Sequence, residues 1–302
     1  MKTVILTGAT SFLGRNLLKG LLQNAYKVYA LVRQSSPDAN KLPQNENLEI
    51  IYGSLDTLDV IEKNVEKADY FIHFGWDGSG NAGRANTEIQ GKNVEYSMNA
   101  LKMAHRLGCQ AFIFPGSQAE YGLKQCRIYE TEECNPVSEY GKAKLKFSQR
   151  AEDFCKEQNM KFIHLRIFSV YGPGDRKNTL VDACIRKFNA GEVMALGPCT
   201  QKWNYLYIED FVEIVLKMMK QGCDTGIYNI ASLDTRTLRE FVREIYELSN
   251  KTGNFNFEDT AQNPEGSPEL IPDVSKMLMV TGNMEMTSFR TGILKTMKSI
   301  FS

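Results

Sequence analysis

The segment Thr7-Gly8-Ala9-Thr10-Ser11-Phe12-Leu13-Gly14 connects an apolar run at residues 3–7 to a helix-length amphipathic segment at residues 13–24. In a strand-to-helix turn of this kind, the first glycine permits a tight reversal and the last lets the helix approach the strand closely. The amino terminus of the helix then presents unpaired N–H groups to an anion such as a pyrophosphate. The position between strand and helix favours this interpretation over an ordinary turn with incidental glycines.

The alternation of apolar runs and helix-length segments continues along the chain, which is typical of βαβ units and a parallel sheet. Strands as apolar as these need cover on both faces. The predicted strands are 3–7, 27–32, 48–52, 70–74, 111–115, 162–168 and 203–208. The predicted helices are 13–24, 86–107, 140–159, 180–190, 211–220 and 237–249. We therefore predict an α/β fold with a doubly wound parallel sheet and a smaller carboxyl-terminal lobe.

The pattern loosens after Tyr171, where Gly172-Pro173-Gly174 is a turn signal. Residues 252–272 carry Gly, Asn and Pro with little periodicity, so we expect this tail to be rich in loops. We predict a first domain at residues 1–170 plus about 203–232, and a second lobe at about 171–202 plus 233–302.

The 302 residues carry 36 Lys and Arg against 36 Asp and Glu, so there is no overall charge bias toward nucleic acid or an anionic membrane. No apolar run approaches the roughly 18 residues that span a bilayer, and the first residues lack the apolar core of a signal peptide. We expect a cytoplasmic protein with neither a membrane nor a nucleic-acid partner. The cysteines contain no C-x-x-C pair and the three histidines lie far apart, so no metal site is predicted.

Tyr140 and Lys144 form a Y-x-x-x-K pair, whose spacing places both side chains on one face of a helix, one turn apart. A phenol is a weak acid at neutral pH, and a neighbouring ammonium lowers its pKa toward the range useful for proton transfer. Taken alone the pair is a weak signal, and its weight comes from its place at the start of a long helix. Ser117 lies just past the predicted strand 111–115, at the edge of the sheet where ligands bind. An ordinary turn serine is the alternative interpretation.

Together, the glycine turn, Ser117 and the Tyr140–Lys144 pair resemble the extended short-chain dehydrogenase/reductase superfamily, specifically the NAD-dependent epimerase/dehydratase family. The family turn is T-G-x-x-G-x-x-G, and Ser11 stands where its middle glycine is expected. Residues 117–122 resemble the family's S-x-x-x-Y-G loop, and residues 136–144 resemble its P-x-x-x-Y-G-x-x-K segment. The resemblance implies a Rossmann-type fold in which the first domain binds a dinucleotide and the second lobe binds the substrate.

Further segments extend the resemblance. Residues 69–76 are similar to the D-x-x-x-H-x-A-A strand that passes beneath the cofactor, in which His73 is interpreted as buried rather than catalytic. Residues 165–174 are similar to L-R-x-x-N-V-Y-G-P, with Ser169 replacing a substrate-contacting asparagine. Residues 203–210 are similar to R-D-F-V-H-V-x-D, which in relatives helps to hold the nucleotide diphosphate, although Trp203 replaces the arginine.

The resemblance implies three sets of site residues. The catalytic residues are Ser117, Tyr140 and Lys144. The cofactor-binding residues are Gly8, Thr10, Ser11, Phe12, Leu13, Gly14, Arg33, Ser54, Leu55, Phe74, Gly75, Trp76, Asn93, Pro115, Tyr140, Lys144, Phe168 and Val170. The substrate-binding residues are Gln118, Ser169, Asn178 and Tyr205.

The choice of cofactor is predicted from the end of the second strand, where an acidic residue would bond the ribose 2′-hydroxyl of NAD(H). Arg33 occupies that place, followed by Ser35 and Ser36. Because arginine pairs bidentately with a 2′-phosphate, NADP(H) is favoured, with NAD(H) as the alternative. The other interpretation of Arg33 is a solvated cation that stacks on adenine.

The resemblance implies hydride exchange with a carbon of a nucleotide-diphosphate sugar. Family dehydratases carry an acidic pair directly after the hydroxyl residue, whereas Gln118 and Ala119 follow Ser117, so dehydration is disfavoured. Arg33 favours net reduction, which makes a 4-keto reductase the first hypothesis and a 4-epimerase with tightly bound NAD the second. A cofactor-sensing protein without turnover is a third. By analogy we also expect a homodimer that pairs through helices 88–107 and 140–159.

Overall fold

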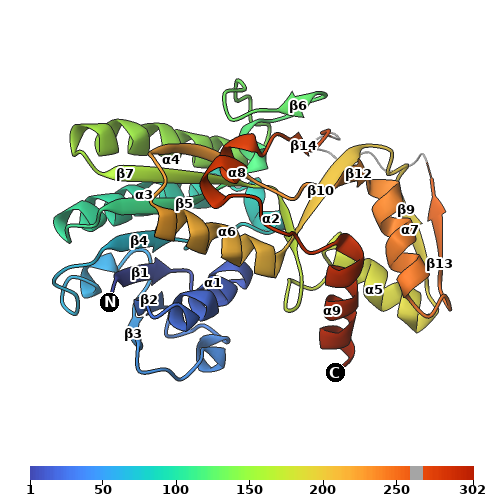
Figure 1. The fold of residues 1–302 in the computed structure, drawn as a ribbon, viewed down its shortest axis with the longest axis horizontal. Coiled ribbons are helices and arrows are strands. Elements are labelled where there is room, and N and C mark those ends of the chain that lie inside the picture. Colours follow the sequence, from blue (N-terminus) through green and yellow to red (C-terminus); the bar gives the residue numbers. More distant parts are fainter. Residues whose placement is uncertain (259–267) are drawn as a thin grey trace. The chain divides into compact units, whose positions relative to one another are not determined.

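The structure, a computed structural model, describes residues 1–258 and 268–302 (Figure 1). The described chain divides into two compact units. Unit 1 comprises Met1–Gly122, Glu133–Ile167 and Val212–Tyr228, and unit 2 comprises Leu123–Glu132, Phe168–Phe211 and Asn229–Ser302. The predicted first domain, residues 1–170 plus about 203–232, differs from unit 1 in four segments that cluster with unit 2: 123–132, 168–170, 203–211 and 229–232.

A seven-stranded sheet forms the centre of unit 1. Its spatial order is β11 (Gly226–Ile230), β7 (Lys161–Ile167), β5 (Ala111–Ser117), β4 (Tyr70–His73), β1 (Thr3–Thr7), β2 (Lys27–Val32) and β3 (Leu48–Tyr52). The registered pairs from β7 to β3 are all parallel. The order reverses between β1 and β4, and ligands of doubly wound sheets bind at the carboxyl ends of the strands at such a reversal. The predicted α/β doubly wound fold is confirmed.

Two pairs of helices pack on this sheet. Gly20 brings α1 against α6, because a Cβ there would lie 2.5 Å from Val212 Cγ1. In contrast, α3 and α4 share a core cluster with Phe112 and Phe114 of β5. The helices of unit 1 are α1 (Phe12–Gln23), α2 (Asn81–Arg84), α3 (Thr87–Arg106), α4 (Glu139–Glu157) and α6 (Ile208–Gln221), with 3-10 turns η1 (Ala39–Lys41), η2 (Leu58–Val60) and η3 (Gln118–Glu120). The first four residues of α6 belong to unit 2.

Aromatic packing fixes α4 on the sheet. The rings of Phe114 and Phe147 lie 4.5 Å apart between centroids in an edge-on contact, and Phe112 and Phe162 surround them. Edge-on pairs of this kind stabilise beyond the area that they bury. Because Phe147 lies one turn after Lys144, this contact also sets the place of the predicted catalytic lysine.

Unit 2 contains three small sheets: β12 (Thr235–Thr237), β10 (Lys202–Tyr207) and β8 (Ser169–Tyr171); β13 (Asn254–Phe257) and β9 (Val193–Leu196); and β14 (Ile271–Pro272) and β6 (Arg127–Ile128). Its helices are α5 (Leu180–Ala190), α7 (Leu238–Leu248), α8 (Ser275–Thr281) and α9 (Phe289–Phe301). The expectation of a loop-rich tail is wrong at β13 and β14. Each pairs with a strand far away in the sequence, and local periodicity cannot show such pairing. Residues 259–267 of that tail lie outside the described residues.

None of the helices within residues 1–258 and 268–302 is both long and apolar enough to cross a bilayer.

Candidate active site

The predicted glycine turn joins β1 to α1 at close quarters. Gly8 has a left-handed backbone (φ +71°), and a Cβ there would lie 2.5 Å from the carbonyl carbon of Phe74. A Cβ on Gly14 would lie 2.1 Å from the Gly8 oxygen, so both positions require glycine. Ser11 is the N-cap of α1, and its Oγ accepts the Gly14 N–H at 3.1 Å. The first turn of α1 carries no acidic residue, so this helix end fits a pyrophosphate.

Tyr140 and Lys144 lie one turn apart at the start of α4, as their spacing predicts. Lys144 is 2% exposed, and its Nζ donates to the Pro115 carbonyl oxygen at 2.8 Å. The same nitrogen lies 3.8 Å from the centre of the Trp76 ring and 5.7 Å from that of Tyr140. Burial lowers the pKa of Lys144 to about 7, and the Glu120 carboxylate opposes this shift. The lysine therefore changes charge near neutral pH.

Trp76 stands where the family pattern has alanine and packs against Tyr140 and Lys144 of α4. Its ring lies edge-on to Tyr140, with centroids 6.1 Å apart. The indole Nε1 donates to Gln90 Oε1 at 2.8 Å, which holds the ring in place. Trp76 thus covers Lys144 and borders Tyr140.

Ser117 ends β5 and is the N-cap of η3. Its Oγ accepts the Ala119 N–H at 3.2 Å, and its own N–H donates to Glu120 Oε1 at 2.7 Å, which is a capping box. Gly141 lets α4 approach this turn, because a Cβ there would lie 2.5 Å from the Ala119 oxygen. The Ser117 turn therefore lies against the first turn of the helix that carries Tyr140.

Glu120 is a buried carboxylate that the sequence analysis does not single out. It lies 3.1 Å from His164 Nε2 and 3.2 Å from Arg166 Nε. Burial by itself raises a carboxyl pKa, but His164 and Arg166 hold the pKa of Glu120 below its usual range. A Cβ on Gly116 would lie 2.1 Å from His164 Nε2, so this network also needs the glycine before Ser117. A sequence signal exists: two basic residues on one face of an apolar strand require a buried acceptor.

His73 lies at the end of β4 and is fully buried. Its Nδ1 is 2.9 Å from Thr7 Oγ1, and its Nε2 is 3.0 Å from Ser97 Oγ. Burial, together with the charge of Lys144, lowers the pKa of His73 to about 3. The imidazole is therefore neutral and bonded on both sides, which supports a buried rather than a catalytic histidine.

The buried His73 predicts acid lability. Between its unfolded pKa of 6.5 and its folded pKa of about 3, the unfolded chain binds a proton that the folded chain does not. The stability is therefore fully present above pH 6.5 and is lost as the pH falls toward 3. Between about pH 6.5 and 4.5, wild type should lose up to about 3 kcal/mol more unfolding free energy than His73→Gln. Urea unfolding at both pH values measures this, with exposed His105→Gln as control, and equal losses in wild type and His73→Gln would contradict it.

The residues predicted to bind the adenosine end of the cofactor come directly after β2, β3 and β4 in the chain. Arg33 Nη1 lies 3.2 Å from Asp77 Oδ1. Ser54 N donates to Thr57 Oγ1 at 2.9 Å, which closes a tight turn after β3. Leu55 follows it, and one of its methyl groups lies 2.8 Å from where a Cβ on Gly75 would be.

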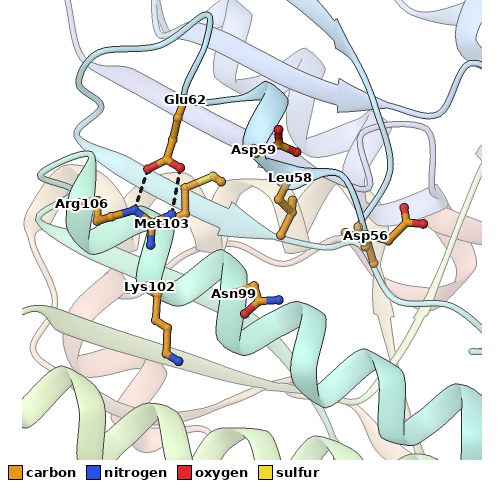
Figure 2. A pocket seen from close by; sticks show the side chains of 9 residues that line it. Asp56, Leu58, Asp59, Glu62, Asn99, Lys102, Met103 and Arg106 are labelled. Carbon is orange, nitrogen blue, oxygen red and sulfur yellow. Dashed lines mark hydrogen bonds and ion pairs between the residues drawn. The ribbon is translucent and has the colours of Figure 1, made fainter.

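Leu55 also borders a cavity of about 250 Å³. Its lining side chains come from the segment after β3 and around η2 and from α3, and Figure 2 shows Glu62 and Arg106 pointing toward each other. Arg106 donates to both carboxylate oxygens of Glu62 there, at 2.7 and 2.9 Å. The cavity is lined by Leu55, Asp56, Leu58, Asp59, Glu62, Asn99, Lys102, Met103 and Arg106.

The other predicted site residues of unit 1 lie in the glycine turn, on α3 and in η3. Thr10, Phe12 and Leu13 are half-buried in the glycine turn. Asn93 is buried on α3, where it bonds the backbone of Asp77. Gln118 is half-buried in η3, directly after Ser117.

Five predicted site residues belong to unit 2: Phe168, Ser169, Val170, Asn178 and Tyr205. Ser169 of β8 is in parallel register with Tyr205 of β10. The Tyr205 ring lies 5.1 Å from that of Phe241, and burial raises the pKa of Tyr205 above its usual value. Asn178 is exposed and has a left-handed backbone (φ +66°) just before α5. Unit 2 thus brings Ser169 and Tyr205 together on neighbouring strands.

Among the described residues, no three His, Cys, Asp or Glu side chains are grouped so that they could hold a metal ion.

A model of the NAD dependent epimerase/dehydratase family matches residues 4–231. The chain belongs to this family. One curated relative is dTDP-4-dehydro-6-deoxyglucose reductase from Escherichia coli, which is 24% identical over 313 residues that cover 98% of this chain and 97% of the relative. Another is ADP-L-glycero-D-manno-heptose-6-epimerase from Cupriavidus pinatubonensis, which is 28% identical over 260 residues, or 79% of this chain and 75% of the relative.

Among solved structures of this epimerase/dehydratase fold is UDP-N-acetylglucosamine 4-epimerase from Methanobrevibacter ruminantium M1, in complex with UDP-N-acetylmuramic acid. It matches with a TM-score of 0.88 and 21% identity, over 99% of this chain and 98% of that one. The family resemblance and the Rossmann-type fold predicted from the sequence are therefore confirmed.

Proposed function

We propose that this protein is an NADP(H)-dependent oxidoreductase that reduces the 4-keto group of a nucleotide-diphosphate sugar. The observation that carries the proposal is the buried contact of Lys144 with the rings of Trp76 and Tyr140, beside the Ser117 turn. The family membership and the reductase and epimerase relatives support the substrate class.

The chemistry assigns one task to each of three side chains. A bound nicotinamide ring supplies hydride transfer. Because Ser117 Oγ accepts the Ala119 N–H, its hydroxyl hydrogen can donate to the substrate carbonyl oxygen. Tyr140 gives that oxygen a proton as it becomes a hydroxyl. The Lys144 ammonium orients the nicotinamide ribose and stabilises the phenolate left on Tyr140.

Arg33 supports NADP(H) as the cofactor. Its guanidinium follows the second strand of the sheet, where the ribose 2′-position of a dinucleotide lies in folds of this type. The side chain is 61% exposed and can therefore turn toward a phosphate.

The test is a direct assay of the purified protein. We expect the protein to be isolated without tightly bound NAD and to oxidise NADPH when a 4-keto-6-deoxy sugar nucleotide is added. Product analysis should show one new hydroxyl and one NADP⁺ per sugar reduced. Protein isolated with bound NAD that interconverts 4-hydroxyl epimers, with no net oxidation of NADPH, would contradict the proposal and favour the epimerase.

The epimerase with tightly bound NAD is the second candidate, because the curated relatives include both activities. Its specific support is that Arg33 is already paired with Asp77, so a cofactor without the 2′-phosphate leaves that pair intact. A cofactor-sensing protein without turnover is the third candidate. Such a protein does not need Ser117, Tyr140 and Lys144 together.

We also expect a homodimer that pairs through α3 and α4. The prediction rests on analogy with relatives, and sedimentation equilibrium measures the mass that checks it.

A further inference from the structure

The ion pair between Arg33 and Asp77 joins two segments that are 44 residues apart in the sequence. Arg33 Nη1 and Asp77 Oδ1 are 3.2 Å apart, and the side chains are 61% and 50% exposed. Exposed pairs of this kind contribute little to folding stability, so the pair breaks at small cost when a better partner arrives.

The pair passes over the end of β1. Thr7, the last residue of β1, is in register with Leu31 of β2 and with His73 of β4. Arg33 lies two residues beyond Leu31, and Asp77 lies four residues beyond His73. The two charged groups therefore meet across the strand end from which the Gly8 turn begins, which is the edge of the sheet that fits a dinucleotide.

Asp77 is held in this place by buried amides of α3. Its backbone N–H donates to Asn93 Oδ1 at 3.0 Å, and Asn93 Nδ2 donates back to the Asp77 carbonyl oxygen at 2.8 Å. The next residue, Gly78, has a left-handed backbone (φ +66°), and its carbonyl oxygen accepts from Gln90 Nε2 at 3.0 Å. The backbone that carries the Asp77 carboxylate is therefore held in place independently of the Arg33 side chain.

We propose that Asp77 is a specificity-determining residue that competes with the 2′-phosphate of NADP(H) for Arg33 and so narrows the preference for NADP(H) over NAD(H). The inference rests on the proposed use of Arg33 in cofactor binding. A phosphate binds arginine more strongly than an exposed carboxylate does, so NADP(H) still displaces Asp77. NAD(H) has no such phosphate and leaves the pair in place.

The experiment is calorimetric titration of NADP⁺ and NAD⁺ into wild type, Asp77→Asn, Arg33→Ala and the double variant. Asp77→Asn should lower the Kd for NADP⁺ by about 2- to 10-fold and leave that for NAD⁺ unchanged. Arg33→Ala should raise the Kd for NADP⁺ by about 10- to 100-fold. In the double variant, the Asp77 substitution should give no gain, because the coupling passes through Arg33.

Glu49→Gln is the matched control. It removes an exposed carboxylate that pairs with Lys27 at 3.8 Å. This pair lies at the amino ends of β2 and β3, away from the carboxyl ends where Arg33 lies, so the substitution should change neither Kd.

The possible failures are distinguishable. If Arg33→Ala weakens NADP⁺ binding but Asp77→Asn does not strengthen it, the role of Asp77 is overturned and the proposed cofactor stands. If Asp77→Asn weakens both cofactors equally, Asp77 only supports its loop, and the inference is again overturned. If Arg33→Ala changes neither Kd, the proposed NADP(H) preference itself fails.

Discussion

Replacing Tyr140 with phenylalanine should lower kcat for sugar-nucleotide reduction by about 10²- to 10⁴-fold, the contribution of a positioned general acid. Phenylalanine keeps the ring that packs edge-on against Trp76 and lies 4.4 Å from the Arg84 guanidinium. The substitution therefore removes the hydroxyl and little else. Steady-state kinetics with NADPH measures kcat, and titration of NADP⁺ measures its Kd. The Kd should stay near the wild-type value.

The control for this substitution is Tyr52→Phe, which removes a hydroxyl from a 56% exposed ring on β3 and should leave kcat unchanged. If Tyr140→Phe keeps the wild-type kcat, Tyr140 is not the proton donor and another group has that role. A loss of NADP⁺ binding as large as the loss of kcat would instead assign Tyr140 to cofactor binding.

Replacing Glu120 with alanine should cost about 3–5 kcal/mol of unfolding free energy, because it leaves the buried Arg166 charge without its carboxylate partner. The Ser117 N–H also loses its acceptor at 2.7 Å, and this opens the capping box of η3. Glu120→Gln keeps an acceptor of the same shape and should lie between wild type and Glu120→Ala. Chemical denaturation monitored by circular dichroism measures all three proteins.

Glu62→Ala is the matched control for the Glu120 variants. Glu62 pairs with Arg106 through two hydrogen bonds, but the Arg106 side chain is 54% exposed, so its removal should cost at most about 1 kcal/mol. Equal costs for Glu120→Ala and Glu62→Ala would show that the buried network adds nothing to stability beyond a surface pair.

The main sheet and the glycine turn could be predicted from the sequence because local patterns encode them. The predicted strands 3–7, 27–32 and 48–52 coincide with β1, β2 and β3, where apolar β-branched residues form short runs between turn signals. The short strands β8, β9 and β13 could not be predicted, because three or four residues carry too little periodicity and their partners are distant in the sequence.

In the candidate site too, local spacing could be predicted from the sequence and tertiary contacts could not. The Y-x-x-x-K spacing was enough to place Tyr140 and Lys144 on one helix face. It could not show that the centre of the Trp76 ring lies 3.8 Å from Lys144 Nζ, nor that the lysine is buried, because both depend on tertiary packing. The pairing of Arg33 with Asp77 was likewise beyond prediction, since it depends on the strand order β4-β1-β2.

The bare backbone at Gly116 has a consequence for protein engineering. A Cβ at that position would overlap His164 and come within 2.5 Å of Glu120 Oε1. The Ser117 turn and strand β7, which carries His164, therefore cannot be replaced independently of each other. A loop transplanted from a homologue with a side chain at this point would collide with the basic strand beneath it. Libraries that diversify the turn should therefore vary Gly116, Glu120, His164 and Arg166 as one linked block, or leave all four untouched.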